Sequence, residues 1–272
     1  MARNAVLSST GPFAGTDGGI GLDRAAWGAR FLQPQTLGSV IRNSFTIYVR
    51  NWTTICLIYI VPLLPLAVLR HVLAEGGHSG WAGLVSFVQL MISILVGAAL
   101  IVAVSDVCLG LKPNLRRAYR RGFGNGRLLK TYFTLVLFLM LGFALLVVPG
   151  LVMVVWYMFA LPATVLEQYT GRAALKRSRE LGRGFYWRNV GIVLVDWLVV
   201  IGVLLVAVIV LVLLELLTLA GNFPLLEGLL GVALAIAVLG PLTSIPLILL
   251  YYDMRARKEG YGAAQLVEDL KI

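Results

Sequence analysis

A chain of 272 residues that is 59% hydrophobic and only 13% charged has too little charge for a soluble protein, whose charged fraction is roughly 25%. Its formal net charge of +10 would suggest a nucleic-acid partner in a soluble protein. In a chain with long apolar segments, an excess of Lys and Arg on the cytoplasmic side of a membrane explains the charge better. The composition therefore predicts an integral membrane protein with no nucleic-acid partner.

Six apolar segments approach or exceed the ~20 residues that a helix needs to cross a hydrocarbon core of ~30 Å. They are continuous rather than alternating, which predicts helices and not a β-barrel. In chain order they cover residues 53–73, 81–107, 128–148, 151–166, 190–217 and 229–251. The third and fourth meet at Pro149 and Gly150, where we expect a tight hairpin that either crosses the membrane or re-enters it.

The basic residues lie before the first segment, between the second and third, between the fourth and fifth, and after the sixth. Arg70 is the single exception among the 23 Lys and Arg residues. The positive-inside rule then places both termini in the cytoplasm. We expect residues 1–36 to form a disordered tail, residues 37–260 the transmembrane domain and residues 261–272 a short cytoplasmic tail.

Three basic segments resemble one another and precede the first, third and fifth spans. They read VIRNSF at 40–45, NLRRAY at 114–119 and ALKRSR at 174–179. Each predicts an amphipathic helix that lies along the inner leaflet. The expected fold class is therefore an all-α polytopic membrane protein with six transmembrane helices in three hairpins, each preceded by a basic interfacial helix. The alternative is that any positive-inside loop is basic and the similarity is convergent.

The basic segments also predict a partner, because Lys and Arg near a membrane surface attract anionic headgroups of the inner leaflet. The candidate headgroup belt comprises Arg116, Arg117, Arg120, Arg121, Lys176, Arg177 and Arg179.

Ionisable residues inside spans are candidate functional groups. Asp106 and Asp196 lie near the cytoplasmic ends of the second and fifth spans, where each could instead pair with a basic residue such as Arg116 or Arg188. Near the outer ends, Arg70 and Glu215 either form an ion pair or reach water separately.

No set of residues suited to catalysis is visible. His71 and His78 are the two histidines, and they flank a glycine-rich turn without the further ligands that a metal site needs. Neither a nucleophile with its base nor a phosphate-binding loop with its Lys is present. We therefore predict a protein that is not an enzyme and has no catalytic residues, metal or cofactor.

The end of the last span carries the most specific motif, LLYYDMRARKEGY at 249–261. Together with ALKRSREL at 174–181 and SFTIYVRNW at 44–52, it resembles the bacterial membrane-domain family named for glycerophosphoryl diester phosphodiesterases. The resemblance covers residues 37–260 and implies a bacterial inner-membrane location. In some members the domain precedes a catalytic barrel, for which this chain has neither the length nor the histidines, so no hydrolase activity is implied.

The tail motif itself consists of Tyr251, Tyr252, Asp253, Arg255, Arg257 and Lys258. We expect Asp253 to pair with Arg255, with Arg257 or with another basic unit, and the motif to dock against the interfacial helices.

Two function classes remain. The first is a non-enzymatic organiser or accessory of membrane lipids, of another membrane protein or of a separately encoded enzyme. The second is a transporter or lipid-handling protein with a cavity between the hairpins, which a polar, kinked centre would favour.

Overall fold

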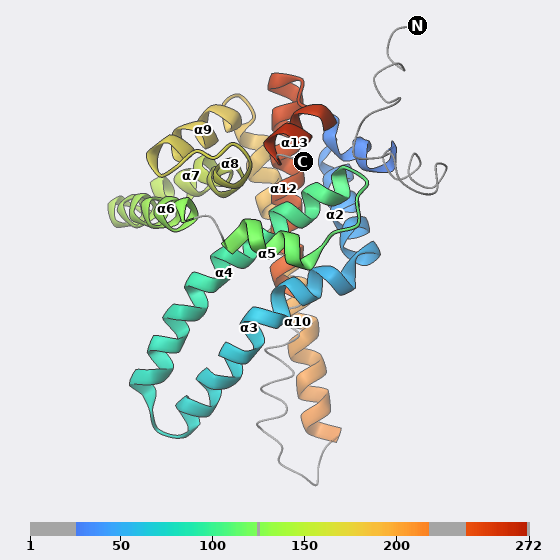
Figure 1. Cartoon of the computed structure of the whole chain (residues 1–272). Coiled ribbons are helices and arrows are strands. Elements are labelled where there is room, and N and C mark those ends of the chain that lie inside the picture. The colour runs from blue at the N-terminus through green and yellow to red at the C-terminus, as the bar shows by residue number, and fades with distance from the viewer. Residues whose placement is uncertain (1–25, 124–125, 218–237, 271–272) are drawn as a thin grey trace, which may run out of the picture.

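The computed structural model describes residues 26–123, 126–217 and 238–270, and within them all regular structure is helical, as predicted (Figure 1). The longest helices are α3 (Trp52–Glu75), α4 (Ser79–Cys108) and α10 (Tyr186–Leu217). The others are α2 (Leu37–Arg50), α5 (Leu115–Phe123), α6 (Arg127–Leu145), α7 (Val147–Tyr157), α8 (Ala160–Leu166), α9 (Arg172–Gly182), α12 (Gly240–Glu259), α13 (Ala263–Asp269) and the short 3-10 helix η1 (Arg30–Leu32).

Five stretches of the described residues are long and apolar enough to cross a membrane, which fits a multi-pass membrane protein. They are Trp52–Glu75, Ser79–Cys108, Arg127–Leu145, Val147–Leu166 and Tyr186–Val206. The predicted sixth span, 229–251, begins outside the described residues, and α12 covers its second part. Six spans in three hairpins therefore stay a prediction.

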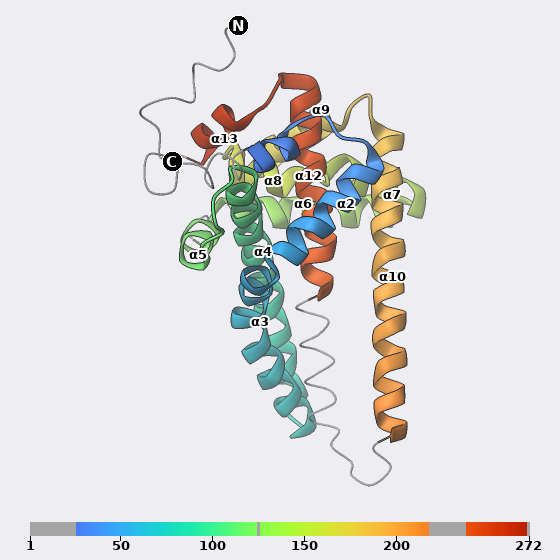
Figure 2. The same ribbon diagram turned by 90° about the vertical axis from the view of Figure 1, so that its right-hand side faces the viewer.

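The long helices α3, α4 and α10 extend to the same side of the rest of the described chain, with α3 and α4 antiparallel to each other (Figures 1 and 2). α3 and α4 lie side by side and are joined by a turn in which Gly77 has a φ of 75°, a value that glycine adopts without strain. α10 stands apart from that pair (Figure 2). Most of its apolar side chains are exposed, among them Trp197, Leu198 and Leu205, which suits a helix surrounded by lipid.

The third and fourth predicted spans differ from expectation. The chain turns at Leu146, which is extended, so Pro149 and Gly150 lie in the first turn of α7 and not in the turn. Proline suits this position because the first helical N–H groups have no partner within the helix. Gly150 is required by packing, since a Cβ atom there would lie 2.4 Å from a ring carbon of Phe143.

The pair α6 and α7 also lies across the direction of α3, α4 and α10. In both views it stays at the upper end of the long helices, near the level of α2 and α5 (Figures 1 and 2). The α7 segment does not continue straight to Leu166, because residues 158–159 separate it from α8.

The three basic segments are helical and coincide with α2, α5 and α9. Each buries one face, but against different neighbours: α2 packs mainly on α12, α5 on α4, and α9 on α7 and α8. The interfacial position of these helices in a membrane stays a prediction.

Residues 26–36 are ordered, contrary to the prediction of a disordered tail from 1 to 36. Phe31 and Leu32 are buried in the core, and the main-chain N–H of Gln35 donates to Asp253 at 2.6 Å. The apolar pair and this long-range hydrogen bond account for the order. The remainder of the predicted tail, 1–25, lies outside the described residues.

The core is centred on the last third of α4, where residues 98–108 are buried on every side. Tyr252 of α12 is fully buried there, and its hydroxyl lies 2.5 Å from the hydroxyl of Ser105. α5 approaches α4 closely at Gly122, where a Cβ atom would lie 2.8 Å from the main-chain nitrogen of Ala99.

This contact predicts that Gly122→Ala destabilises the protein by about 1–3 kcal/mol, because backbone cannot move aside as a side chain does. Gly97→Ala in α4 is the control, since a Cβ atom there would meet nothing within 4 Å. It should be neutral or stabilising by up to about 1 kcal/mol. Unfolding of both variants in one detergent measures this, and equal stabilities would contradict the close approach of α5.

Candidate functional site

The C-terminal end of α12 contains a fully buried carboxylate, Asp253. Arg188, in the first turn of α10, forms an ion pair with it, and the Nε atom of Arg257 donates to both oxygens at 3.1 and 3.2 Å. Both guanidinium groups also donate to the main-chain oxygen of Gln35, at 2.6 and 2.7 Å. Of the predicted partners, Arg257 and a residue of another basic unit are therefore correct, and Arg255 is wrong.

Arg255 instead belongs to a second cluster of charges beside α9. Its Nε lies 3.0 Å from Glu259 and its Nη1 lies 2.6 Å from Asp269 of α13. Its guanidinium also covers the Tyr261 ring at 3.7 Å from the centroid. Burial opposes the charge of Arg255, but nearby Tyr251, Tyr261 and Glu167 outweigh it and raise its pKa.

Arg177 of α9 completes this cluster. Its guanidinium lies 2.6 Å from Glu167 and 2.5 Å from Glu259, and the Tyr251 hydroxyl donates to Glu167 at 2.6 Å. Arg177 was predicted to face lipid headgroups, but its side chain is only 18% exposed and is neutralised within the fold. The carboxylates that pair with Arg177 belong to Glu167, directly after the fourth predicted span, and to Glu259, at the end of α12. Both lie in basic segments of the sequence.

The other residues of the predicted headgroup belt are either half-buried beside a carboxylate or exposed. Arg117 is half-buried and lies 3.3 Å from the Asp106 carboxylate, so the predicted pairing of Asp106 involves this residue and not Arg116. Arg121 is also half-buried near Asp106. Exposed belt residues are Arg116, Arg120, Lys176 and Arg179.

Asp196 lies in a different setting from Asp106. It lines a pocket of about 180 Å³ between α2, α10 and α12, which Arg42 of α2 also lines. It makes no ion pair with any residue that the structure describes, because Arg188 binds Asp253 instead. The side chain of Glu215 lies outside the described part of the chain, so its ion pair with Arg70 stays a prediction.

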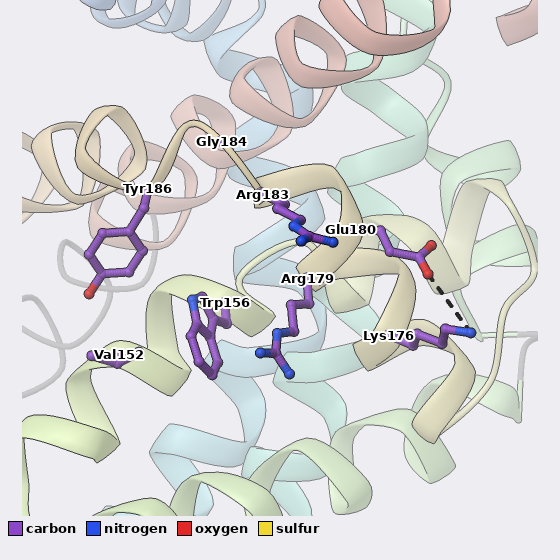
Figure 3. Close-up of a pocket in the computed structure, with 9 residues that line it drawn as sticks. Val152, Trp156, Lys176, Arg179, Glu180, Arg183, Gly184 and Tyr186 are labelled. Atoms are coloured by element: carbon purple, nitrogen blue, oxygen red, sulfur yellow. Dashed lines mark ion pairs between the residues drawn. The ribbon is translucent and has the colours of Figure 1, made fainter.

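A pocket of about 720 Å³ opens between α7, α9 and the start of α10 (Figure 3). Its basic side chains are Lys176, Arg179 and Arg183, and Glu180 is its single acidic one. The Arg179 guanidinium covers the Trp156 ring at 4.2 Å from the centroid. The headgroup belt predicted from the sequence contains Lys176 and Arg179 but not Arg183, which lies four residues beyond Arg179.

Hydrogen bonds from α9 and α12 hold this pocket in shape. The Ser178 hydroxyl donates to the main-chain oxygen of Trp156 at 2.8 Å and accepts from the Phe159 N–H at 3.0 Å, so α9 fixes the end of α7. Lys258 donates to the main-chain oxygens of Glu180 and Arg183 at 2.6 and 2.7 Å. Burial, and then the charges of Arg183 and Arg177, lower the pKa of Lys258.

These side chains suit recognition of an anion. Arg179 and Arg183 present guanidinium donors, for which phosphate is a preferred partner, while Trp156 and Tyr186 offer apolar surface beside them. Within the described residues, no group of three or more His, Cys, Asp or Glu could hold a metal ion.

Comparison with protein-family models, with curated proteins and with solved structures finds no match to this chain. The resemblance of the tail motif to the glycerophosphoryl diester phosphodiesterase membrane-domain family therefore stays a prediction.

Asp253→Asn should lower the free energy of unfolding by about 3 kcal/mol, because it removes the fully buried charge that pairs with the guanidinium groups of Arg188 and Arg257. Glu75→Gln is the control, since its carboxylate is 49% exposed and its pair with His71 is local. Such a change should cost less than about 1 kcal/mol. Unfolding in one detergent compares the two, and equal losses would contradict the central role of Asp253.

The lowered pKa of Glu259 predicts how the stability of the folded protein depends on pH. Burial alone would raise its pKa, but hydrogen bonds from Arg255 and Arg177 outweigh burial and lower it below the ordinary 4.5. A carboxyl with a lower pKa in the folded state stabilises fully above its unfolded pKa, and the contribution is lost as pH falls through its folded pKa. Glu259→Gln should therefore have a lower Tm at neutral pH and a Tm that falls less on acidification. Tm curves against pH that stay parallel for both proteins would contradict this.

Proposed function

We propose that the protein is a non-enzymatic, multi-pass protein of the bacterial inner membrane that holds the phosphate headgroups of anionic lipids in the pocket beside α9. In this role it organises lipid or accompanies another membrane protein or a separately encoded enzyme. Both termini lie on the cytoplasmic side in this proposal, and the chain is a member of the glycerophosphoryl diester phosphodiesterase membrane-domain family.

One observation carries the proposal. Arg179 and Arg183 line a large open pocket, and neither makes an ion pair with a described residue. Other arginines of the same region, such as Arg177 and Arg188, are neutralised by carboxylates. Exposed cations that are not paired with carboxylates are available to bind the phosphate of a lipid headgroup. The indole ring of Trp156, under Arg179, offers apolar surface for the first carbons of the acyl chains.

The position of the pocket supports the same function. α9 and the α6–α7 pair lie at the upper end of the long apolar helices (Figures 1 and 2). If α3, α4 and α10 cross the bilayer, this end lies at a membrane surface, where a basic pocket meets headgroups and not acyl chains. The crosswise orientation of α6 and α7 fits a hairpin that re-enters from this surface.

A lipid-handling protein is the second candidate, and the pocket at Asp196 favours it. A carboxylate that faces an apolar pocket between three helices, without an ion pair to any described residue, is expensive to retain in a membrane. In that function the pocket would admit part of an amphiphile between α2, α10 and α12.

The test is retention of phosphatidylglycerol by the full chain in native mass spectrometry. Each Lys or Arg near a headgroup contributes about 1 kcal/mol, so Arg179→Ala with Arg183→Ala should weaken binding at this pocket roughly 30-fold. The wild-type protein should prefer phosphatidylglycerol to phosphatidylcholine.

The matched control is Arg172→Ala with Lys130→Ala, which removes the same charge from exposed positions that do not line the pocket. Unchanged retention in the control and loss in the pocket variant supports the proposal. Equal loss in both would mean that net charge alone attracts the lipid, and the proposal of a headgroup pocket would then be abandoned.

A further inference from the structure

A second basic pocket, of about 320 Å³, lies where α2 passes into α3 and where the chain leaves α4. It goes beyond the function proposed for α9, because it is built from other elements. The side chains that matter for its chemistry are Trp27, Arg50, Thr53, Thr54 and Lys112.

The pocket is formed by an abrupt change from a basic helix to an apolar one. A single non-helical residue, Asn51, separates α2 from α3, so Arg50 at the end of α2 lies directly before the threonines of the first turn of α3. Lys112 reaches the same pocket from the segment that follows α4. Two cations and two hydroxyl groups, from segments far apart in sequence, therefore meet in one cavity.

Its positive charge is not neutralised by the described residues. Neither Arg50 nor Lys112 makes an ion pair with any of them, and none of the residues that line the pocket carries a carboxylate. Asp106, the acidic residue nearest to Lys112 in sequence, is paired with Arg117. The pocket beside α9, by contrast, contains Glu180.

The two pockets share one construction. Each lies where a basic helix is followed by a long apolar helix, and in each an arginine of the last turn covers a tryptophan from another segment. Arg50 covers Trp27 at 4.6 Å, and Arg179 covers Trp156 at 4.2 Å. The helices that carry these arginines, α2 and α9, lie on opposite sides of α12 (Figure 1).

We propose that this pocket is a second binding site for a phosphate group, most suitably that of an anionic lipid headgroup. Guanidinium, ammonium and hydroxyl donors all bind phosphate oxygens. The Arg50 guanidinium lies over the indole ring of Trp27, which also offers apolar surface beside it. The protein thereby binds two phosphate-bearing ligands on opposite sides of α12.

Native mass spectrometry of the full chain with added phosphatidylglycerol tests this proposal through the number of lipids retained. Wild type should retain two specific lipids. Arg50→Ala with Lys112→Ala should retain one, with binding at the lost site weakened roughly 30-fold. The variant of the α9 pocket, Arg179→Ala with Arg183→Ala, should also retain one, and the combined variant none.

Two further measurements distinguish a free phosphate ligand from a lipid headgroup, and loss of the site from a general loss of positive charge. Thermal stabilisation by inorganic phosphate that disappears in Arg50→Ala with Lys112→Ala, without lipid retention, would support a site for a free phosphate ligand. The control Arg172→Ala with Lys130→Ala should retain both lipids; a loss there equal to that in the pocket variants would overturn the site.

The outcomes for the two pockets are distinguishable. Full retention, and full stabilisation by phosphate, in Arg50→Ala with Lys112→Ala would overturn this second site, whatever the α9 variant does. Loss only in Arg50→Ala with Lys112→Ala would support the second site and overturn the function proposed for α9. Both pocket variants must show the circular dichroism of the wild type, so that a loss of binding is not a loss of fold. Arg50→Lys keeps the charge that Arg50→Ala removes and should therefore retain part of the binding.

Discussion

The buried carboxylate of Asp253 is the interaction on which the rest of the arrangement depends. A fully buried charge is tolerated only when it is paired and hydrogen-bonded, and Asp253 is satisfied from three separate parts of the chain: Gln35 before α2, Arg188 at the start of α10 and Arg257 on its own helix. Because these partners are far apart in sequence, one side chain fixes where α2, α10 and α12 meet.

The charges next to it explain how the fold positions its pockets. Arg177 and Arg255 bind Glu167, Glu259 and Asp269, which joins α9 and α13 to α12. The basic residues are thereby divided into a group neutralised inside the protein and a group left without carboxylates. Members of the second group, Arg179, Arg183, Arg50 and Lys112, line the open pockets, so the same acidic residues that stabilise the fold determine which cations can meet a ligand.

The proposed chemistry lies at one end of the long helices and not midway along them. Cations near a bilayer surface retain contact with water and with headgroups, whereas an ionised group at the centre of the hydrocarbon core is costly. In the proposed function, the two pockets, each with an arginine over a tryptophan ring, lie at this surface. Asp196 is the exception, since it faces an apolar pocket between helices.

The sequence alone determined the helical class, the candidate membrane-spanning segments within the described residues and the basic helices at 40–45, 114–119 and 174–179. These features follow from the length and composition of apolar runs, which depend on residues close together in sequence. The partners of Asp253, the burial of Arg177 and the pocket at Arg183 were decided by tertiary structure. A basic residue looks the same in sequence whether it faces lipid or a carboxylate; Arg177 and Arg179, two positions apart, have opposite fates because successive helical positions point in different directions. The crosswise position of α6 and α7 likewise depends on packing against α8 and α9, which the hydropathy of 128–166 does not encode.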